Sequence, residues 1–286
     1  GGYYEGLATF PGVNSVKILN PLSNELNVLR QTLLFGGLES IQRNINFRNL
    51  NLKLYEFGNC YVFKPEVKSQ KPLDKYSEHF SIGIWLTGEN LKEHWMTKPE
   101  KQNFYHLKGY VHSILSRFGF SIDRIDVSEA PCDIYAYGLT YKAQGKHLVT
   151  YGMVSPEILR QFDIKTDVFF AEIMWLPLMD MIAESKIQYQ ELPKFPEVRR
   201  DLALLIDSSV KYEQIRKLAF ETERKLLKSV NLFDVYQGKN IPEGKKSYAI
   251  SYILQDESKT LTDEQIDRTM KRLIDVYVRE LGAQIR

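Results

Sequence analysis

The chain has 286 residues, of which 43% are hydrophobic and 26% charged, and its 38 basic and 36 acidic side chains leave a formal net charge of +2. This is the composition of a globular protein of one large or two medium domains, and it excludes a disordered chain. The absence of a run of ~18 apolar residues excludes a membrane helix, and no basic-then-apolar leader opens the sequence. Two cysteines, Cys60 and Cys132, are too few for a disulfide framework or a four-ligand zinc site, and they indicate a reduced, cytoplasmic protein.

The first two thirds of the chain mix helical and extended patterns. Leu34, Leu38, Ile41 and Ile45 recur at helical spacing, and residues 107–118 form a second candidate helix. Strands are predicted at 52–57, 80–87, 134–141, 147–154 and 168–174. Because strands and helices do not alternate regularly, these elements predict an α+β domain with a mixed, largely antiparallel sheet.

A domain boundary is predicted near residue 190. Pro193 and Pro196 stand within four residues, and each proline removes a backbone donor and makes its predecessor extended. The segment is therefore a connector between domains at 1–190 and 191–286. Residues 1–190 carry 20 basic and 20 acidic side chains against 18 and 16 in residues 191–286, so all the excess positive charge lies in the shorter second part.

The second part predicts a ferredoxin-like split βαβ domain. Leu202, Leu204 and Ile206 alternate as in a strand, and a helical stripe follows from Ile215 to Leu226. Two more strands are predicted at 230–236 and 247–254. The last helix opens with Thr262-x-x-Gln265, a capping box, and ends before Gly282, after which residues 283–286 could add a short strand. The order strand–helix–strand–strand–helix–strand defines this fold.

No catalytic or metal-binding constellation is visible in the sequence. The glycine-rich phosphate loops and the nucleophile elbow are missing, and the five histidines do not have zinc-protease spacing. The histidines are best interpreted as surface or hydrogen-bonded core residues, and Gly36-Gly37 as a site of close packing. Cys132 is interpreted as inert, and Asp123 and Asp126 as solvated residues or a cap.

The candidate binding residues lie in the second part. The helix-free face of a split βαβ sheet commonly stacks unpaired bases, and Tyr236 is predicted to lie on it, whereas Tyr248 and Tyr252 belong to the core. Basic residues are predicted to surround this face as phosphate contacts: Arg199, Arg200, Lys239, Lys245 and Lys246. The alternatives are solvated surface charges and, for Tyr236, a side chain buried against the neighbouring domain.

Five motifs in order resemble the C-terminal part of the β subunit of bacterial phenylalanyl-tRNA synthetases. They are Asn20-Pro21-Leu22-Ser23 followed by Leu29-Arg30-x-Thr32-Leu33-Leu34; Leu54-Tyr55-Glu56-Phe57-Gly58; Leu86-Thr87-Gly88 with Phe104-Tyr105-x-Leu107; Phe195-Pro196-x-Val198-x-Arg200-Asp201-Leu202; and Phe233-Asp234-Val235-Tyr236 with Leu254-Gln255-Asp256. Phe35 replaces a usual proline, His106 replaces a usual acidic residue, and an H-P-G-R-like stretch is not visible near 135–141. Family β subunits carry further upstream domains, so the chain resembles a fragment.

The resemblance implies that residues 1–190 form a catalytically silent class II synthetase-like core and residues 191–286 a ferredoxin-fold anticodon-binding domain. A working class II site needs an arginine with a nearby glutamate, and Phe47-Arg48-Asn49-Leu50 lacks the glutamate. The implied partners are the α subunit, in an α2β2 heterotetramer, and phenylalanine tRNA. ATP and magnesium are expected in the holoenzyme and no cofactor in this chain.

The resemblance also implies that the helix bearing Leu34, Leu38, Ile41, Gln42 and Ile45 lies at a subunit interface, with an intramolecular core helix as the alternative. Two other functions remain open. One is a free-standing RNA-binding or regulatory protein that uses the ferredoxin-like domain without an α subunit. The other is an independent enzyme using Asp123, Asp126 or Cys132, for which no assembled constellation is visible.

Overall fold

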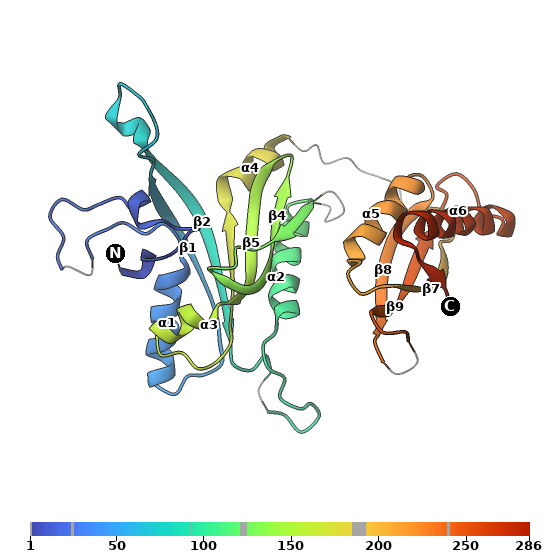
Figure 1. The fold of residues 1–286 in the computed structure, drawn as a ribbon, viewed down its shortest axis with the longest axis horizontal. Coiled ribbons are helices and arrows are strands. Elements are labelled where there is room, and N and C mark those ends of the chain that lie inside the picture. Colours follow the sequence, from blue (N-terminus) through green and yellow to red (C-terminus); the bar gives the residue numbers. More distant parts are fainter. Residues whose placement is uncertain (1, 24–25, 92, 121–124, 185–192, 239–240) are drawn as a thin grey trace. The chain divides into compact units, whose positions relative to one another are not determined.

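The computed structural model describes residues 2–23, 26–91, 93–120, 125–184, 193–238 and 241–286. It divides the chain into two compact units, Gly1–Ile187 and Gln188–Arg286 (Figure 1). Within the described ranges, every helix is too short or too polar to cross a bilayer. Asp123 and Lys239, two residues considered from the sequence, lie outside the described residues.

The first unit is built on a six-stranded sheet of order β1-β2-β6-β5-β4-β3 in which neighbouring strands are antiparallel. The strands are β1 (Leu52–Phe63), β2 (Tyr76–Thr87), β3 (Asp126–Glu129), β4 (Tyr135–Ala143), β5 (Lys146–Val154) and β6 (Val168–Met174). The expected antiparallel α+β architecture is therefore confirmed. The short edge strand β3 was not predicted, because four residues contain too little alternation to be recognised.

Helices cover both faces of this sheet. They are α1 (Leu34–Asn46), α2 (Phe104–Arg117), α3 (Pro156–Gln161) and α4 (Trp175–Glu184), with short 3₁₀ turns at Gly2–Tyr4, Gly12–Asn14 and Pro72–Lys75. α1 and α3 share one hydrophobic cluster, and α2 and α4 share the cluster on the other face (Figure 1). Side chains of β6 alternate between the clusters, so Phe170 packs with α1 and Phe169 with α2.

The position of α1 corrects the interface prediction for three of its residues. Leu34, Leu38 and Ile41 are completely buried and pack in the core of their own unit. They form an intramolecular core stripe, which was the alternative interpretation, since a helix of a globular protein buries its apolar face first. Gln42 and Ile45 keep partial exposure.

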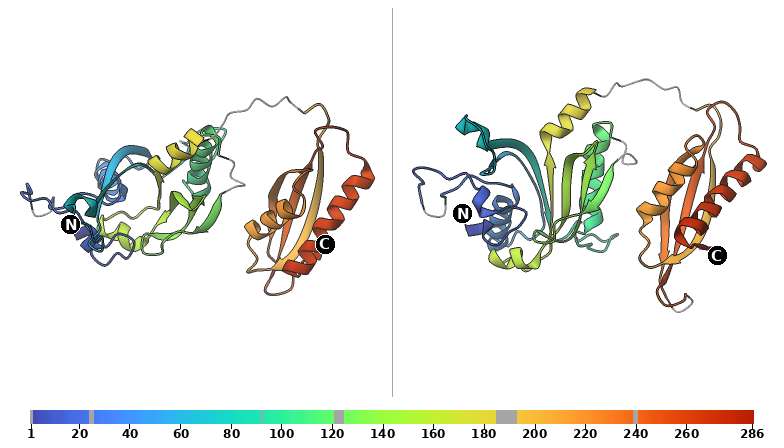
Figure 2. Two further views of the ribbon diagram at one scale, coloured as in Figure 1. Left: turned by 90° about the horizontal axis from the view of Figure 1, so that it is seen from above. Right: turned by 45° about the horizontal axis from the view of Figure 1, so that its top comes forward.

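The second unit has the expected split βαβ order, so this prediction is confirmed. Its elements are β7 (Val198–Asp207), α5 (Tyr212–Thr222), β8 (Leu227–Tyr236), β9 (Lys245–Leu254), α6 (Asp263–Leu281) and β10 (Gln284–Ile285). The strands form an antiparallel sheet of order β10-β7-β9-β8. The two helices contact each other and pack along this sheet (Figure 2).

Strand alternation determines which face of the second sheet the helices cover. Leu204 stands opposite Tyr248 and Leu202 opposite Ile250, and these side chains pack in one cluster with residues of α5 and α6. The ends of α6 match the sequence signals: the Thr262 hydroxyl accepts the Gln265 N–H, and Gly282 adopts φ 59°. The residues between the core positions on each strand point to the opposite face, which carries the candidate site.

Candidate functional site

The helix-free face of the second sheet carries side chains of three strands, which are exposed on β7 and β8 and more buried on the central strand β9. Because Leu202, Leu204 and Ile250 face the helices, their neighbours point the other way. We call this surface the open face, and its members are Arg199, Asp201, Ala203 and Lys245, Ala249, Ser251 on β7 and β9, with Phe233, Asp234 and Tyr236 on β8. The small residues of β9 in the middle of the sheet leave the larger side chains of β7 and β8 accessible.

Arg199 is held in place across the open face. Its Nε and Nη2 atoms donate to Oδ1 and Oδ2 of Asp201 at 2.8 and 3.2 Å, and this hydrogen bonding raises the pKa of Arg199. Its guanidinium carbon lies 5.3 Å from the centre of the Phe233 ring, a cation–π distance. The open face therefore presents a planar cation and an aromatic ring side by side.

A β-bulge in β8 gives Phe233 its position. Leu232 stands opposite Ile250 and Asp234 opposite Ala249, so Phe233 is the extra residue between two successive pairs. Phe233 is 49% exposed. Strand alternation in the sequence does not distinguish Phe233 from its neighbours. The β-bulge that places Phe233 outside the regular strand pairing cannot be recognised from such a pattern. The only sequence signal for it is the Phe233–Tyr236 motif of the family resemblance.

Tyr236 lies on the open face as predicted. It stands opposite Ser247 on β9, and its side chain is 41% exposed. Lys245 stands opposite Asp207 at the end of the same surface and is partly exposed. These two residues and Arg199 are the described members of the predicted set that the structure brings to one face.

Two of the predicted basic residues lie elsewhere, and the prediction that all surround one face is wrong for them. Arg200 stands opposite Tyr252, on the helix side, with Nη2 3.8 Å from an oxygen of Asp263. Lys246 is 8% exposed, and its Nζ donates to the Ser208 carbonyl oxygen at 2.9 Å. The reason is the period of two: adjacent residues such as Arg199 and Arg200 cannot share a face of one strand.

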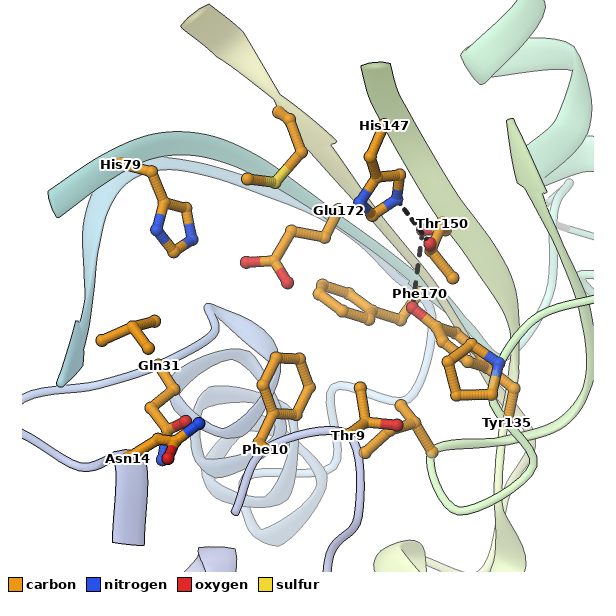
Figure 3. A pocket seen from close by; sticks show the side chains of 14 residues that line it. Thr9, Phe10, Asn14, Gln31, His79, Tyr135, His147, Thr150, Phe170 and Glu172 are labelled. Atoms are coloured by element: carbon orange, nitrogen blue, oxygen red, sulfur yellow. Dashed lines mark hydrogen bonds between the residues drawn. The ribbon is translucent and has the colours of Figure 1, made fainter. Parts of the chain in front are cut away.

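The first unit contains a partly enclosed cavity of about 310 Å³ on the sheet face that α1 covers (Figure 3). Strands β1, β2, β4, β5 and β6 contribute to one wall and the segment before α1 to the other. The lining residues are Thr9, Phe10, Asn14, Gln31, Val62, His79, Pro131, Ile134, Tyr135, His147, Thr150, Phe170, Glu172 and Met174. The sequence analysis did not identify this site, although Glu172 is the single charge in the apolar run of β6.

Glu172 joins the sheet to the start of α1. Its Oε2 accepts the Thr32 hydroxyl at 2.7 Å, and its Oε1 accepts the Leu33 N–H at 3.0 Å and the Cys60 thiol at 3.8 Å. Burial raises the pKa of Glu172, and the three donors act against that rise because they stabilise the carboxylate. Burial also raises the pKa of Cys60, which keeps this thiol protonated and inert.

Two of the five histidines line the cavity, and the other three lie elsewhere. His106 caps α2 and the His112 Nε2 lies 2.9 Å from the Tyr141 hydroxyl, whereas His79 and His147 line the cavity. Burial lowers the pKa of both cavity histidines, so they are neutral at pH 7. Within the described parts of the chain no three His, Cys, Asp or Glu side chains are grouped to hold a metal ion.

The cavity does not fit ATP. A triphosphate requires cations, yet the lining includes no lysine or arginine and holds the Glu172 carboxylate. Arg48, in the segment that resembles part of a class II site, lies in a turn after α1 with φ 63° and is not a lining residue. Cys132 is exposed, and Asp126 begins the edge strand β3. We therefore derive no reaction step in this unit.

Two family models match successive parts of the chain. "Phenylalanyl tRNA synthetase beta chain CLM domain" matches residues 4–175, and "Ferredoxin-fold anticodon binding domain" matches residues 193–286. Among solved structures, the crystal structure of pyrrolysyl-tRNA synthetase from Desulfitobacterium hafniense is similar with a TM-score of 0.43 and 14% identity, over 60% of this chain and 54% of that chain.

Curated relatives match the chain from end to end. The "Phenylalanine--tRNA ligase beta subunit" of Bacteroides fragilis is 48% identical over 286 residues, covering 99% of this chain and 35% of the relative. That of Porphyromonas gingivalis is 43% identical over 288 residues, covering 100% of this chain and 35% of the relative. The chain thus spans about a third of the length of these relatives. Because the first model alone matches more than half of its residues, the chain belongs to the family of phenylalanyl-tRNA synthetase β chains.

Proposed function

We propose that the chain acts as part of the β subunit of a cytoplasmic phenylalanine–tRNA ligase, and that its second unit binds the anticodon region of phenylalanine tRNA with the open face. The observation that carries this proposal is the exposed pair of Arg199 and Phe233 on the face that also carries Tyr236. Support also comes from the relatives, which are phenylalanine–tRNA ligase β subunits, and from the family model for anticodon-binding domains that matches the second unit.

The chemistry of the open face suits unpaired bases. Single-stranded RNA loops are recognised by stacking of bases on aromatic rings and on arginine planes. Phe233 and Arg199 supply one such platform and Tyr236 a second, while Lys245 at the edge can neutralise a phosphate. The Arg199 charge is balanced by Asp201, so stacking contributes more to this site than net positive charge.

The test compares phenylalanine tRNA with the same tRNA carrying a changed anticodon. Phe233→Ala and Tyr236→Ala are expected to weaken binding of phenylalanine tRNA by about 1–3 kcal/mol each and to reduce the preference over the changed tRNA. Val235→Ala is the matched control. Val235 is about as exposed as Phe233, but it stands opposite Tyr248 and belongs to the face of the sheet that the helices cover. Unchanged binding in both aromatic variants would refute the proposal.

We also propose that the first unit is a scaffold that contacts the α subunit in an α2β2 assembly. The corrected contact is the outer edge of α1, where Gln42 and Ile45 are partly exposed, continued by Phe47 and Leu50, which are 74% and 50% exposed. Two exposed apolar residues next to a helix edge are typical of a small interaction surface.

Charging this edge tests the proposed contact. Gln42→Glu with Asn46→Glu should weaken association with co-expressed α subunit in gel filtration without lowering the melting temperature. The control, Gln70→Glu with Gln161→Glu, adds the same charge at two other exposed positions. Association that survives the first pair would exclude this edge. A chain that never associates with an α subunit yet binds RNA would favour the alternative, a free-standing RNA-binding protein.

We assign ATP and magnesium to the partner α subunit. The support is the cavity lining, which lacks the cations that a triphosphate requires. The mixed α and β subunits should therefore charge phenylalanine tRNA, while this chain alone should not. Phenylalanine charging by the isolated chain would contradict this assignment.

A further inference from the structure

The cavity of the first unit has an unusual balance of charge for a pocket of its size. About 310 Å³ is at the lower end of the ligand pockets of proteins, about 300–1,000 Å³. Glu172 is the one acidic lining residue, and no lysine or arginine joins it. The two lining histidines are neutral at pH 7 because burial disfavours their charged forms.

The Glu172 carboxylate keeps room for a further donor. Its Oε1 receives the Leu33 N–H and the Cys60 thiol, whereas the single contact of Oε2 is the Thr32 hydroxyl at 2.7 Å. A carboxylate oxygen has two acceptor positions, so one position on Oε2 is left in the described structure. Figure 3 shows the carboxylate pointing into the cavity, on the side of His79 and above Phe10.

Arg30, the cation whose charge acts on Glu172, is held by other groups. Arg30 has its Nη1 2.6 Å from Oε1 of Glu56 and donates from Nε to the Asn59 carbonyl oxygen at 2.9 Å. Its charge acts on Glu172 only as the weakest of the influences on that carboxylate. A partly buried carboxylate without a direct ion-pair partner attracts a positively charged ligand.

Aromatic side chains form much of the apolar surface of the cavity. Tyr135 and Phe170 lie almost parallel, with ring centres 6.4 Å apart and planes inclined by 9°, and Phe10 and Met174 complete the apolar surface. These rings can pack against an apolar ligand body and can also attract a cation over their faces. The lining therefore offers one anionic group, a large apolar surface, and six polar side chains without a formal charge at pH 7, which are Thr9, Asn14, Gln31, His79, His147 and Thr150.

We propose that this cavity binds a small primary amine with an aromatic or other apolar body and without a carboxylate, its ammonium group on Glu172 and its body against Phe170 and Tyr135. An amino acid would bring its own carboxylate into a site that already holds the Glu172 carboxylate and has no lysine or arginine in its lining. The site therefore distinguishes an amine from the corresponding amino acid. This inference does not depend on tRNA binding by the second unit.

Three probes that share one phenylethyl body test the proposal on the complete 286-residue chain. They are phenethylamine, its neutral analogue 2-phenylethanol, and phenylalanine, which adds a carboxylate to the amine. Methyl resonances of the methionines report binding: Met174 lines the cavity, and Met96, which is 69% exposed, is the reference. Phenethylamine should shift Met174 saturably and leave Met96 unchanged, and it should bind about tenfold or more tightly than either analogue, as expected for a charged hydrogen bond.

Glu172→Gln tests the carboxylate, with Glu157→Gln as the control because Glu157 is exposed and lies outside the cavity lining. The first variant should abolish the preference for phenethylamine over 2-phenylethanol, and the second should keep it. If Glu172→Gln does not fold, binding of the three probes to the unmodified chain still tests the proposal. Phenylalanine or 2-phenylethanol binding as tightly as phenethylamine, or no saturable shift of Met174 with phenethylamine, would overturn the proposal.

Discussion

Gly37 illustrates how a single residue can connect the sequence to the core. A Cβ atom on Gly37 would collide with the indole of Trp85, which is 1% exposed, whereas a Cβ atom on Gly36 would meet open space. The expectation of close packing at Gly36-Gly37 is therefore confirmed for the second glycine only. The sequence alone could not show which of the two glycines is closely packed, because the side chain that faces Gly37 comes from a strand nearly fifty residues away.

We predict opposite effects from the two alanine substitutions. Gly37→Ala should destabilise the first unit by about 1–3 kcal/mol, because overpacking displaces Trp85. Gly36→Ala should raise stability by about 0.5–1 kcal/mol, because glycine is a poor helix former. Urea unfolding measures both, and equal effects of the two substitutions would contradict the packing of Trp85 against α1.

His112 makes the first unit sensitive to acid. Burial, with a smaller effect of Lys108, lowers the pKa of His112 to about 4, whereas an unfolded histidine titrates near 6.5. The unfolded state therefore binds the proton first, so stability is retained above pH 6.5 and is lost as the pH falls from 6.5 towards 4. His79 and His147 act in the same direction, since burial lowers their pKa values too.

His112→Gln should reduce the loss of stability between pH 7.5 and 5 by about 1–2 kcal/mol, because the glutamine takes up no proton. Urea midpoints of the first unit at the two pH values measure this difference. His94→Gln, at an exposed position, should leave the pH dependence as it is. A parent-like pH dependence in His112→Gln would show that His112 is not protonated on unfolding.

At the scale of elements, periodic patterns predicted most of the fold. α1, β7 and α6 have clear repeats, and each is present. α3 and α4 were not predicted, because α3 has only six residues and α4 follows β6 without a break and includes Pro177. The cavity could not be predicted either: its walls come from five strands and from a segment before α1, and no local pattern joins Phe10 to Glu172.

Substitutions of the two lysines at the start of β9 should have different effects, one on tRNA binding and the other on the stability of the second unit. Lys245→Ala should weaken binding of all tRNAs alike and flatten its salt dependence, with stability unchanged within about 0.5 kcal/mol. Lys246→Ala should instead destabilise the second unit by about 1–2 kcal/mol, because the Ser208 carbonyl oxygen loses its donor. Filter binding at several salt concentrations and thermal melting measure the two effects. A loss of stability in Lys245→Ala together with a loss of tRNA binding in Lys246→Ala would contradict the register of β9.

At the scale of the whole molecule, each unit has its own core, which suggests independent folding. The second unit contains one hydrophobic cluster built on Ile250, Tyr252 and Leu273, and the first unit has two clusters of its own. We predict that residues 191–286 expressed alone melt cooperatively, at a temperature close to that of the corresponding transition in the complete chain. A fragment that melts without cooperativity would contradict the two-domain organisation.

The central prediction for the whole molecule is that the open face of the second unit contacts RNA. Chemical-shift mapping of the labelled chain with an anticodon stem-loop of phenylalanine tRNA tests this most directly. We expect the largest changes at Arg199, Phe233 and Tyr236 on β7 and β8, and smaller changes with a stem-loop whose anticodon is altered. Changes confined to α5 and α6, or equal changes with both stem-loops, would contradict the account.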